Sequence, residues 1–445
     1  MSSCHAESDW LENDVARSIR GREGLSPVFD ITMTIELRSV TDDNFNEWRK
    51  AVRHGFGEHV HPDDIGRLRN ERAELDRLIA AVDTQSNRIV GTGGADSYRL
   101  TVPGGEMLPM AGVAYMTTSV THRRQGAFSN MMAHIHDAAR ERGDVISGLW
   151  ASQSHLYGRF DYGLSIDSYD WEIDPNFGDF SYSPIDNSST LGAQVSFIDA
   201  IEAEVILPGI YERMHHQTVG SVDRTPGRWR YQLFDEERVR HGASPLFFAV
   251  CEEAGEQTGY VSYRMRRKGD SDMGTLEVVE QVSVTDVAHA VIWRFLLDFD
   301  LVGKITALNR PSDDSLWWML ADPRRLRRKS HDALWVRLLD IPKALEARTY
   351  NADGRLKIGV VSDVQPEVGG TYVVEIDDSR GSVKKTTEKP DVVMSTADLS
   401  ALYLGGTGPG PLVEAGRVEE IATGSIAKLR GMFSSDSAPW CTHYF

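Results

Sequence analysis

The chain has 445 residues, 41% of them hydrophobic and 26% charged, which is the composition of a soluble globular protein with more than one hydrophobic core. Its net charge of −18 disfavours nucleic acid and anionic membranes as partners and favours cationic compounds, although solubility alone would also explain it. Three scattered cysteines, Cys4, Cys251 and Cys441, exclude a disulfide framework and fit a reducing cytoplasm, where we expect the protein to reside.

The first 33 residues contain early acidic side chains and no apolar run that could form the core of a signal peptide. We expect neither secretion by that route nor a membrane span, because no stretch approaches roughly 18 consecutive apolar residues. Residues 1–33 are interpreted as an N-terminal extension, either disordered or an artefact of the chosen start site.

Hydrophobic patterns predict an α/β domain over residues 34–180. Its strand-like runs are residues 34–38, 88–94, 99–102, 112–120 and 145–150. Apolar residues at helical spacing predict one helix around Trp48 and Val52 and another through Met131 and Ile135.

The order of elements over residues 190–330 echoes the order in the first domain. A helix is expected to open at Pro208, because proline is favoured in the first helical turn. Strand-like runs follow at residues 246–250, 259–263 and 275–279, and a helix at residues 289–297. This part has no second Arg-Arg-x-Gly turn, so the pattern predicts a repeated fold without a repeated active site.

Residues 331–445 predict a third, α+β domain. It is expected to open with the apolar run 333–339 and to continue with strands at 356–361 and 372–376 and a helix at 395–404.

A phosphate-binding turn is predicted at Arg123-Arg124-Gln125-Gly126, between the strand 112–120 and the following helix. Backbone N–H groups and the positive end of a helix converge there, Gly126 permits close approach, and the two arginines add charge-assisted hydrogen bonds. A basic helix terminus on the surface is an equally plausible interpretation of this spacing alone.

The turn resembles the acetyl-CoA-binding motif of GNAT acetyltransferases, except that Phe128 replaces the small residue at the last position. A larger residue there is characteristic of the Eis branch. The resemblance to Eis covers roughly residue 34 to the end, and its motifs are Val102–Gly105, Ala111–Val113, Thr121–Gly126, Leu149–Ser152, Leu156–Gly163, Leu316–Arg324, Trp335–Pro342 and the aromatic C-terminus.

The resemblance implies an overall α/β (α+β) architecture of two GNAT-type mixed-sheet domains followed by a sterol-carrier-like domain. It also implies a homohexamer that transfers an acetyl group from acetyl-CoA to an amine of a cationic small molecule such as an aminoglycoside. No metal, nucleic acid or membrane takes part in such a reaction.

Two catalytic residues follow from the family motifs. Tyr157 would be the general acid that protonates the CoA sulfur, and the C-terminal carboxylate of Phe445 would be the general base. Without the resemblance, Tyr157 is better interpreted as a core aromatic and Phe445 as part of a frayed tail. However, Pro439, Trp440, Tyr444 and Phe445 form an apolar end that predicts a buried terminus, where desolvation would raise the pKa of a carboxylate and make it a better base.

The remaining site residues also follow from the resemblance. Those expected to contact the cofactor are Met116 and Thr118 through backbone amides, Arg123, Arg124, Gly126, Ala127 and Ser152. Glu58 matches an acidic position near the substrate mouth and could pair with an ammonium group, although a solvated surface glutamate is the more usual interpretation.

Two histidine pairs carry no predicted function. His59 and His61 are two residues apart and lack a clear third ligand, which argues against a metal site. His215 and His216 are adjacent on a predicted helix and are interpreted as surface residues.

Two other functions remain open. A protein-lysine or polyamine acetyltransferase fits the cofactor motif equally well, because that motif identifies the donor and not the acceptor. A lipid-binding protein with a vestigial acetyltransferase site is the alternative from another class.

Overall fold

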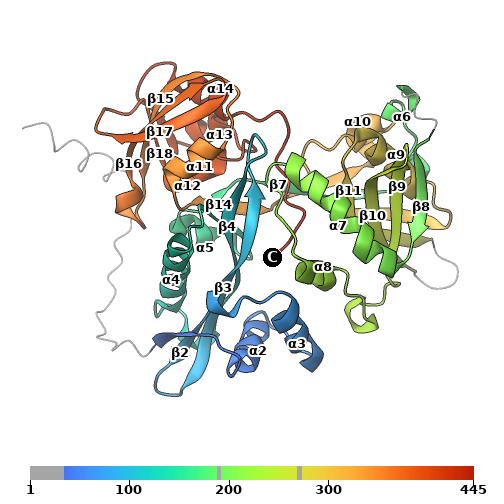
Figure 1. The fold of residues 1–445 in the computed structure, drawn as a ribbon, viewed down its shortest axis with the longest axis horizontal. Coiled ribbons are helices and arrows are strands. Elements are labelled where there is room, and N and C mark those ends of the chain that lie inside the picture. Colours follow the sequence, from blue (N-terminus) through green and yellow to red (C-terminus); the bar gives the residue numbers. More distant parts are fainter. Residues whose placement is uncertain (1–34, 188–191, 268–272) are drawn as a thin grey trace, which may run out of the picture.

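A computed structural model describes residues 35–187, 192–267 and 273–445, so the predicted extension 1–33 lies outside the described residues. Three sheets, each with its own helices, form the molecule, and the C-terminus lies between the first two of them (Figure 1). No helix among the described residues is long and apolar enough to cross a membrane.

The first sheet has seven strands in the order β1-β2-β3-β4-β5-β14-β6. They are β1 (Ile35–Ser39), β2 (Leu78–Asp83), β3 (Arg88–Thr101), β4 (Met107–Thr118), β5 (Ile146–Trp150), β14 (Leu334–Leu338) and β6 (Gly163–Leu164). Its helices are α2 (Phe45–Gly55), α3 (Pro62–Glu71), α4 (Ala127–Glu141) and α5 (Ser154–Tyr157). The two runs predicted at 88–94 and 99–102 are one continuous strand, β3, which continues through Gly91, Gly93 and Gly94.

Amphipathic spacing explains the two long helices of this domain. Phe45, Trp48 and Val52 are buried on one face of α2, and the Trp48 indole donates a hydrogen bond to the Ile79 carbonyl at 2.9 Å. On α4, Met131 and Ile135 are buried against the opposite face of the sheet, as the sequence predicted.

The second sheet has the order β13-β7-β12-β11-β10-β9-β8. Its strands are β13 (Arg327–Asp332), β7 (Asp167–Ile173), β12 (Val302–Arg310), β11 (Gly274–Ser283), β10 (Glu256–Arg266), β9 (Phe247–Glu253) and β8 (Gln194–Ile198). Its helices are α6 (Pro184–Asn187), α7 (Ala200–Gln217), α8 (Pro226–Gln232), α9 (Asp286–Leu297) and α10 (Leu316–Met319).

Two sequence predictions about α7 are wrong. The helix begins at Ala200 and not at Pro208, because Asp199 and Glu202 form a capping box at its start and outweigh the proline signal. His215 is fully buried and not on the surface; its Nδ1 lies 3.2 Å from the Thr101 hydroxyl, which also donates to the His215 carbonyl. His216 is exposed, as predicted.

The sheets exchange strands near the predicted domain boundaries at residues 180 and 331. β7 precedes residue 180 but lies in the second sheet, and β14 follows residue 331 but lies in the first, between β5 and β6. The run 333–339 therefore does not open the third domain. The sequence showed an apolar run there, but an apolar run does not specify which sheet it joins.

The third sheet has the order β17-β16-β15-β18-β19. Its strands are β17 (Arg380–Thr386), β16 (Gly370–Asp377), β15 (Gly354–Val361), β18 (Val392–Ser395) and β19 (Val418–Glu420), and its helices are α11 (Ile341–Ala347), α12 (Thr396–Leu402), α13 (Pro409–Glu414) and α14 (Ser425–Phe433). One continuous apolar core joins this sheet to the first, with Ile146 and Val336 in the same cluster as Leu356 and Phe433.

Candidate active site

The first sheet opens between β4 and β5. The two strands run parallel and pair only from Met110 and Ile146 to Gly112 and Gly148. β4 then continues to Thr118 and β5 to Trp150 without pairing with each other, while each remains paired with its outer neighbour, β3 or β14. We call this opening the first fork, and its free backbone edges are available to a ligand.

A β-bulge shapes the β4 side of the first fork. Tyr115 has a positive φ of 63°, and the register with β3 shifts between Thr92 and Gly94. The Thr92 hydroxyl donates to the Tyr115 carbonyl at 2.8 Å and fixes the bulge. Met116 and Thr118, whose amides were predicted to contact the cofactor, follow the bulge in the part of β4 that does not pair with β5.

The predicted phosphate turn joins β4 to α4. Arg124 and Gly126 both have positive φ, 64° and 82°, a conformation that turns successive N–H groups toward one point. No side chain caps α4, and its first turn, which begins with the buried Ala127, contains no acidic residue. Arg123 and Arg124 are exposed beside it. This turn therefore suits an anion such as a pyrophosphate.

Tyr157 lies beyond the end of β5, at the end of α5. Its side chain is buried, and its ring packs against Phe128 and Tyr162, each with ring centres 6.1 Å apart. Burial raises the pKa of Tyr157, while a hydrogen bond with Ser152 acts in the opposite direction. The phenol thus stays protonated at neutral pH and can donate a proton. Phe128, the departure from the general motif, joins the phosphate turn to the turn that holds Tyr157.

The C-terminus is buried at the base of the first fork, as the sequence predicted. Phe445 is 8% exposed, and its ring packs on Tyr98 with centres 4.8 Å apart. A Cβ at Gly112 would collide with the Tyr98 ring at 2.5 Å and lie 3.0 Å from the Phe445 ring, so both rings pack closely over this glycine. The Trp150 indole donates to the His443 carbonyl at 3.0 Å and ties the tail to the end of β5.

Glu58 follows α2 in the loop beside β4. Gly55, at the end of α2, lies directly against Thr117, so this loop begins next to the first fork. The Glu58 carboxylate is paired with Arg53 at 2.5 Å and is half exposed. An ammonium group would have to compete with this arginine for it.

A buried hydrogen-bond chain supports the base of the first fork, and sequence reasoning missed it. Arg337 Nη1 donates to His136 Nδ1 at 2.7 Å, and His136 Nε2 lies 2.8 Å from the Tyr162 hydroxyl. That hydroxyl contacts Ser147 at 2.5 Å, and Ser147 donates to the Ala111 carbonyl. Burial and the nearby arginine lower the pKa of His136 well below its usual value, which keeps the imidazole neutral. Ala111 and Ser147 pair directly before the strands separate.

Other residues that the sequence did not indicate are Trp150 and Tyr98. Trp150 lies within a motif that pointed to the family, but nothing marked its indole as an anchor for the tail. Tyr98 is one of several apolar positions on β3, and its contact with Phe445 joins residues too far apart in sequence for any local pattern to show.

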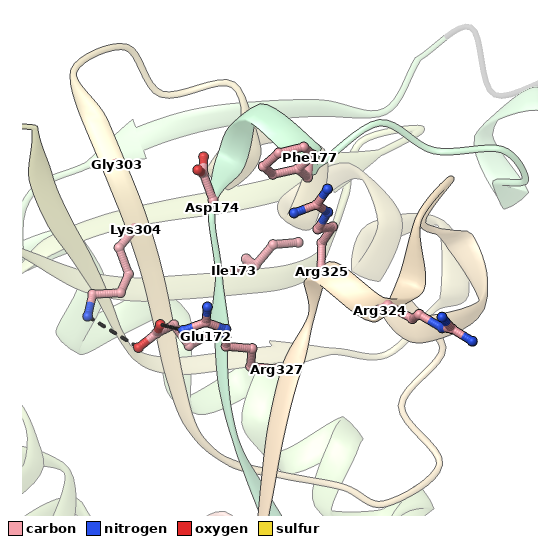
Figure 2. Close-up of a pocket in the computed structure, with 9 residues that line it drawn as sticks. All are labelled: Glu172, Ile173, Asp174, Phe177, Gly303, Lys304, Arg324, Arg325 and Arg327. Atoms are coloured by element: carbon pink, nitrogen blue, oxygen red, sulfur yellow. Dashed lines mark hydrogen bonds and ion pairs between the residues drawn. The ribbon is translucent and has the colours of Figure 1, made fainter.

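A separate basic cavity of about 380 Å³ lies at the edge of the second sheet (Figure 2). It contains none of the predicted site residues. Lys304 and Arg327 both pair with Glu172, and Arg325 pairs with Asp322. Three of the four cations that line it are therefore paired with carboxylates, and none of the four belongs to the first fork.

Of the histidine pair considered as metal ligands, His61 has a structural role. His61 is the N-cap of α3, where its side chain accepts from the Asp63 amide at 3.4 Å. Within the ranges that the structure describes, no group of three potential ligand side chains could hold a metal ion.

Comparison with known families divides the chain into three parts. Residues 36–165 and residues 220–338 each match a family described as an acetyltransferase (GNAT) domain. Residues 341–442 match the sterol carrier protein domain. The predicted fold class, two GNAT-type domains followed by a sterol-carrier-like domain, is confirmed.

Full-length relatives extend the similarity. An uncharacterized N-acetyltransferase of Streptomyces coelicolor is 35% identical over 419 residues, which cover 93% of this chain and 100% of the relative. The N-acetyltransferase Eis of Mycobacterium tuberculosis is 29% identical over 408 residues, covering 91% of this chain and 98% of Eis. The crystal structure of Eis1 from Mycobacterium abscessus superposes with a TM-score of 0.80 at 27% identity, covering 92% of this chain and 100% of Eis1.

Proposed function

The chain belongs to the Eis-type GNAT N-acetyltransferases, and on that premise we propose that it transfers the acetyl group of acetyl-CoA to amines of cationic compounds such as aminoglycosides. One observation carries the proposal. The first fork has a protonated, buried tyrosine beyond one of its strands and the buried C-terminus at its base.

The residues of the first fork fit acetyl-CoA. Arg123, Arg124 and the uncapped amides that start at Gly126 and Ala127 would hold the pyrophosphate. The unpaired backbone at Met116 and Thr118 would receive the thioester end, with Ser152 on the opposite side. Bound there, acetyl-CoA supplies an activated acetyl group.

The roles that the resemblance assigns to Tyr157 and Phe445 comprise two proton transfers. The Phe445 carboxylate takes a proton from the acceptor ammonium, so that the nitrogen has a free electron pair. As the nitrogen forms its bond to the acetyl carbon and the carbon–sulfur bond breaks, Tyr157 would give its phenolic proton to the sulfur, and the proton that the acylated nitrogen then loses would restore the phenol. Burial favours both roles, because it keeps the phenol protonated and removes water that would compete for the acceptor nitrogen.

The proposed class of acceptor, a cationic amine, is inferred from the net negative charge of the protein. With 66 acidic and 48 basic residues, the protein attracts polycations over a long range. A polyamine or a protein lysine carries the same ammonium group and is the second candidate. A purely lipid-binding protein with a vestigial site is disfavoured, because Tyr157, the phosphate turn and the buried terminus are all in place.

The test measures release of CoA thiol from acetyl-CoA with aminoglycosides, polyamines and lysine peptides as acceptors. A Gly-Ser extension after Phe445 moves the carboxylate, whereas Phe445→Leu keeps it. We expect aminoglycoside turnover that the extension abolishes and that Phe445→Leu retains in large part. Turnover that survives the extension would rule out the terminal base, and absence of turnover with every amine would favour the lipid-binding alternative.

We also propose the homohexameric state and the cytoplasmic location that the resemblance implies. Light scattering at micromolar concentration measures the mass of the oligomer. A mass of one to three chains would contradict the hexamer.

A further inference from the structure

The second GNAT-type domain has a fork of its own. β11 and β12 run parallel and pair from Gly274 and Val302 to Val278 and Ala307, with α9 as their connection. Beyond these pairs, residues 279–283 of β11 and 308–310 of β12 are not paired with each other. We call this opening the second fork. The topology is the same as that of β4, α4 and β5 around the first fork.

The second fork is closed to a CoA pyrophosphate. The Thr285 hydroxyl caps α9 by accepting from the Ala288 amide, and Asp286 adds a negative charge to the first turn. Arg310 lies within the fork, where its guanidinium donates to the Gln281 carbonyl at 3.1 Å and to the Gln281 side chain at 2.8 Å.

A cavity of about 210 Å³ remains at the mouth of this fork. One wall comes from the two strands and the other from the C-terminal tail. The lining residues that matter here are Val279, Gln281 and Leu308 from the strands and Trp440, Thr442 and Tyr444 from the tail.

The tail is extended, and its side chains alternate between the two domains. Trp440, Thr442 and Tyr444 line the second-fork cavity. Cys441 and Phe445 are buried in the core of the first domain, and the His443 ring packs on Tyr98 there. This alternation is the period of an extended chain. The same six residues therefore form a wall of the cavity and end at the base of the first fork.

Contacts at both ends hold the tail in this position. The Trp440 amide donates to the Val219 carbonyl at 2.7 Å, and its indole donates to the Asn309 carbonyl at 2.7 Å. At the other end, the Tyr444 ring packs on Trp150 with centres 5.1 Å apart. Five residue steps separate Trp440 from Phe445, a span of at most roughly 17 Å.

The cavity is polar but locally neutral. The Glu280 carboxylate is occupied by Arg224 at 2.5 Å and by the Tyr260 hydroxyl at 2.6 Å. The charge of Arg310 is matched by Asp314 at 2.7 Å. The Trp440 and Tyr444 rings, the Thr442 side chain and the aliphatic side chains of Val279 and Leu308 line it. Aromatic rings, a hydroxyl and aliphatic side chains suit a hydroxylated, amine-bearing ring better than a phosphate.

We propose that the second fork is a distal subsite for the acceptor. It holds a remote ring of an elongated, multi-ring amino sugar while a reacting amine of the same molecule lies at the first fork. This inference rests on the proposed acetyltransferase function. It assigns to the second domain a role in selecting long acceptors over single-ring amines.

The test fills the cavity from its exposed side. Leu308 lines the cavity and is 67% exposed, so that Leu308→Trp would obstruct it without disturbing the core. The matched control is Leu301→Trp, which changes a 76% exposed leucine next to the opposite end of β12. Thermal unfolding of both variants checks that they fold like the native protein.

With a three-ring aminoglycoside, Leu308→Trp should raise KM about 10-fold, the magnitude expected when one ring loses its pocket. KM for acetyl-CoA and turnover of the single-ring amine 2-deoxystreptamine should stay within about 2-fold. Leu301→Trp should change none of these values.

Two outcomes would overturn the subsite. One is an equal KM for the three-ring acceptor in both variants; the other is an equal loss with 2-deoxystreptamine, which would place the effect at the first fork. Calorimetric binding of the three-ring aminoglycoside to full-length protein is measured in parallel. If no amine is turned over, the proposed function fails, and the subsite is then judged by binding: an unchanged affinity in Leu308→Trp refutes it, and an affinity about 10-fold weaker supports it.

Discussion

Each of the two GNAT-type domains has two parallel strands, connected by a helix, that separate into a fork. The two forks differ in the cap of that helix and in the side chains between the strands. In the first, Gly126 is the N-cap of α4 and provides no capping side chain, and residues 113–118 of β4 and 149–150 of β5, which do not pair across the fork, include no charged residue. In the second, Thr285 caps α9 and Arg310 lies between the strands. The start of the helix therefore leaves amide donors free for a ligand in the first fork and not in the second.

The buried pair of Arg310 and Asp314 shows how the second fork stays closed. Both side chains are almost fully buried, and His289 also contacts Asp314 at 2.9 Å. Burial raises the pKa of Asp314, but His289 and Arg310 outweigh it and hold the pKa well below its usual range. The first fork contains no comparable charge pair among the described residues of its unpaired strands.

Removing the proposed general acid, Tyr157, should have the largest effect on activity. Tyr157→Phe is expected to lower kcat by about 10²–10⁴-fold, because the leaving sulfur loses its proton donor, while KM for acetyl-CoA changes little. CoA-thiol release measures both constants. Tyr263→Phe, at a buried tyrosine of the second domain, is the control and should leave kcat unchanged. A kcat within about 3-fold of native in Tyr157→Phe would mean that another group supplies the proton.

Opening the second fork should affect stability and not chemistry. Asp314→Asn leaves Arg310 buried without a counter-charge and should lower the free energy of unfolding by about 3–5 kcal/mol. Asp322→Asn, which breaks the half-exposed pair with Arg325, should cost less than about 1 kcal/mol. Urea unfolding measures both values. Equal losses in the two variants would show that the Arg310 pair does not hold the fork.

The same pair predicts a pH dependence. A carboxylate whose pKa is lowered by folding stabilises the protein fully above its unfolded pKa of about 3.9 and loses that effect as the pH falls toward the folded pKa. The stability difference between native protein and Asp314→Asn should therefore be constant from pH 7 to about pH 5 and shrink below about pH 4. A difference that grows on acidification would have the wrong sign for this mechanism.

A glycine substitution in the phosphate turn tests whether this turn binds the cofactor or only contributes to stability. Gly126→Ala places a side chain at a φ of 82°, which should cost about 1–2 kcal/mol and displace the amides, raising KM for acetyl-CoA about 10-fold. Gly255→Ala introduces the same strain at a φ of 87° in the turn between β9 and β10, where nothing contacts a Cβ. The control should lose stability only. An unchanged KM in Gly126→Ala would exclude this turn from cofactor binding.

The smallest effect should come from the cap of the second fork. Thr285→Ala removes the hydroxyl that accepts from the Ala288 amide and donates to the Glu253 carboxylate, and should cost about 1–2 kcal/mol of stability. Thr225→Ala, which removes only the cap of α8, should cost about 1 kcal/mol. Neither variant should bind a second acetyl-CoA, because Arg310 still occupies the fork. A second binding event in calorimetry would show that capping alone distinguishes the two forks.

By itself, the sequence determined the features that depend on the pattern of residues within a single segment. Amphipathic spacing located α2 and α4, and the Arg-Arg-Gln-Gly run between a strand and a helix indicated the phosphate turn. The apolar C-terminal residues predicted a buried end, since leaving them in water would cost free energy. Resemblance to a family supplied the roles of Tyr157 and Phe445, which no local pattern specifies.

Tertiary structure alone decided which distant segments meet. β7 and β14 join sheets across the predicted domain boundaries, because alternation defines the faces of a strand but not its neighbours. His215 is buried because a strand more than a hundred residues away covers it. The contact of Phe445 with Tyr98 and the closure of the second fork by Arg310 likewise depend on packing between segments far apart in sequence, which spacing along one segment does not encode.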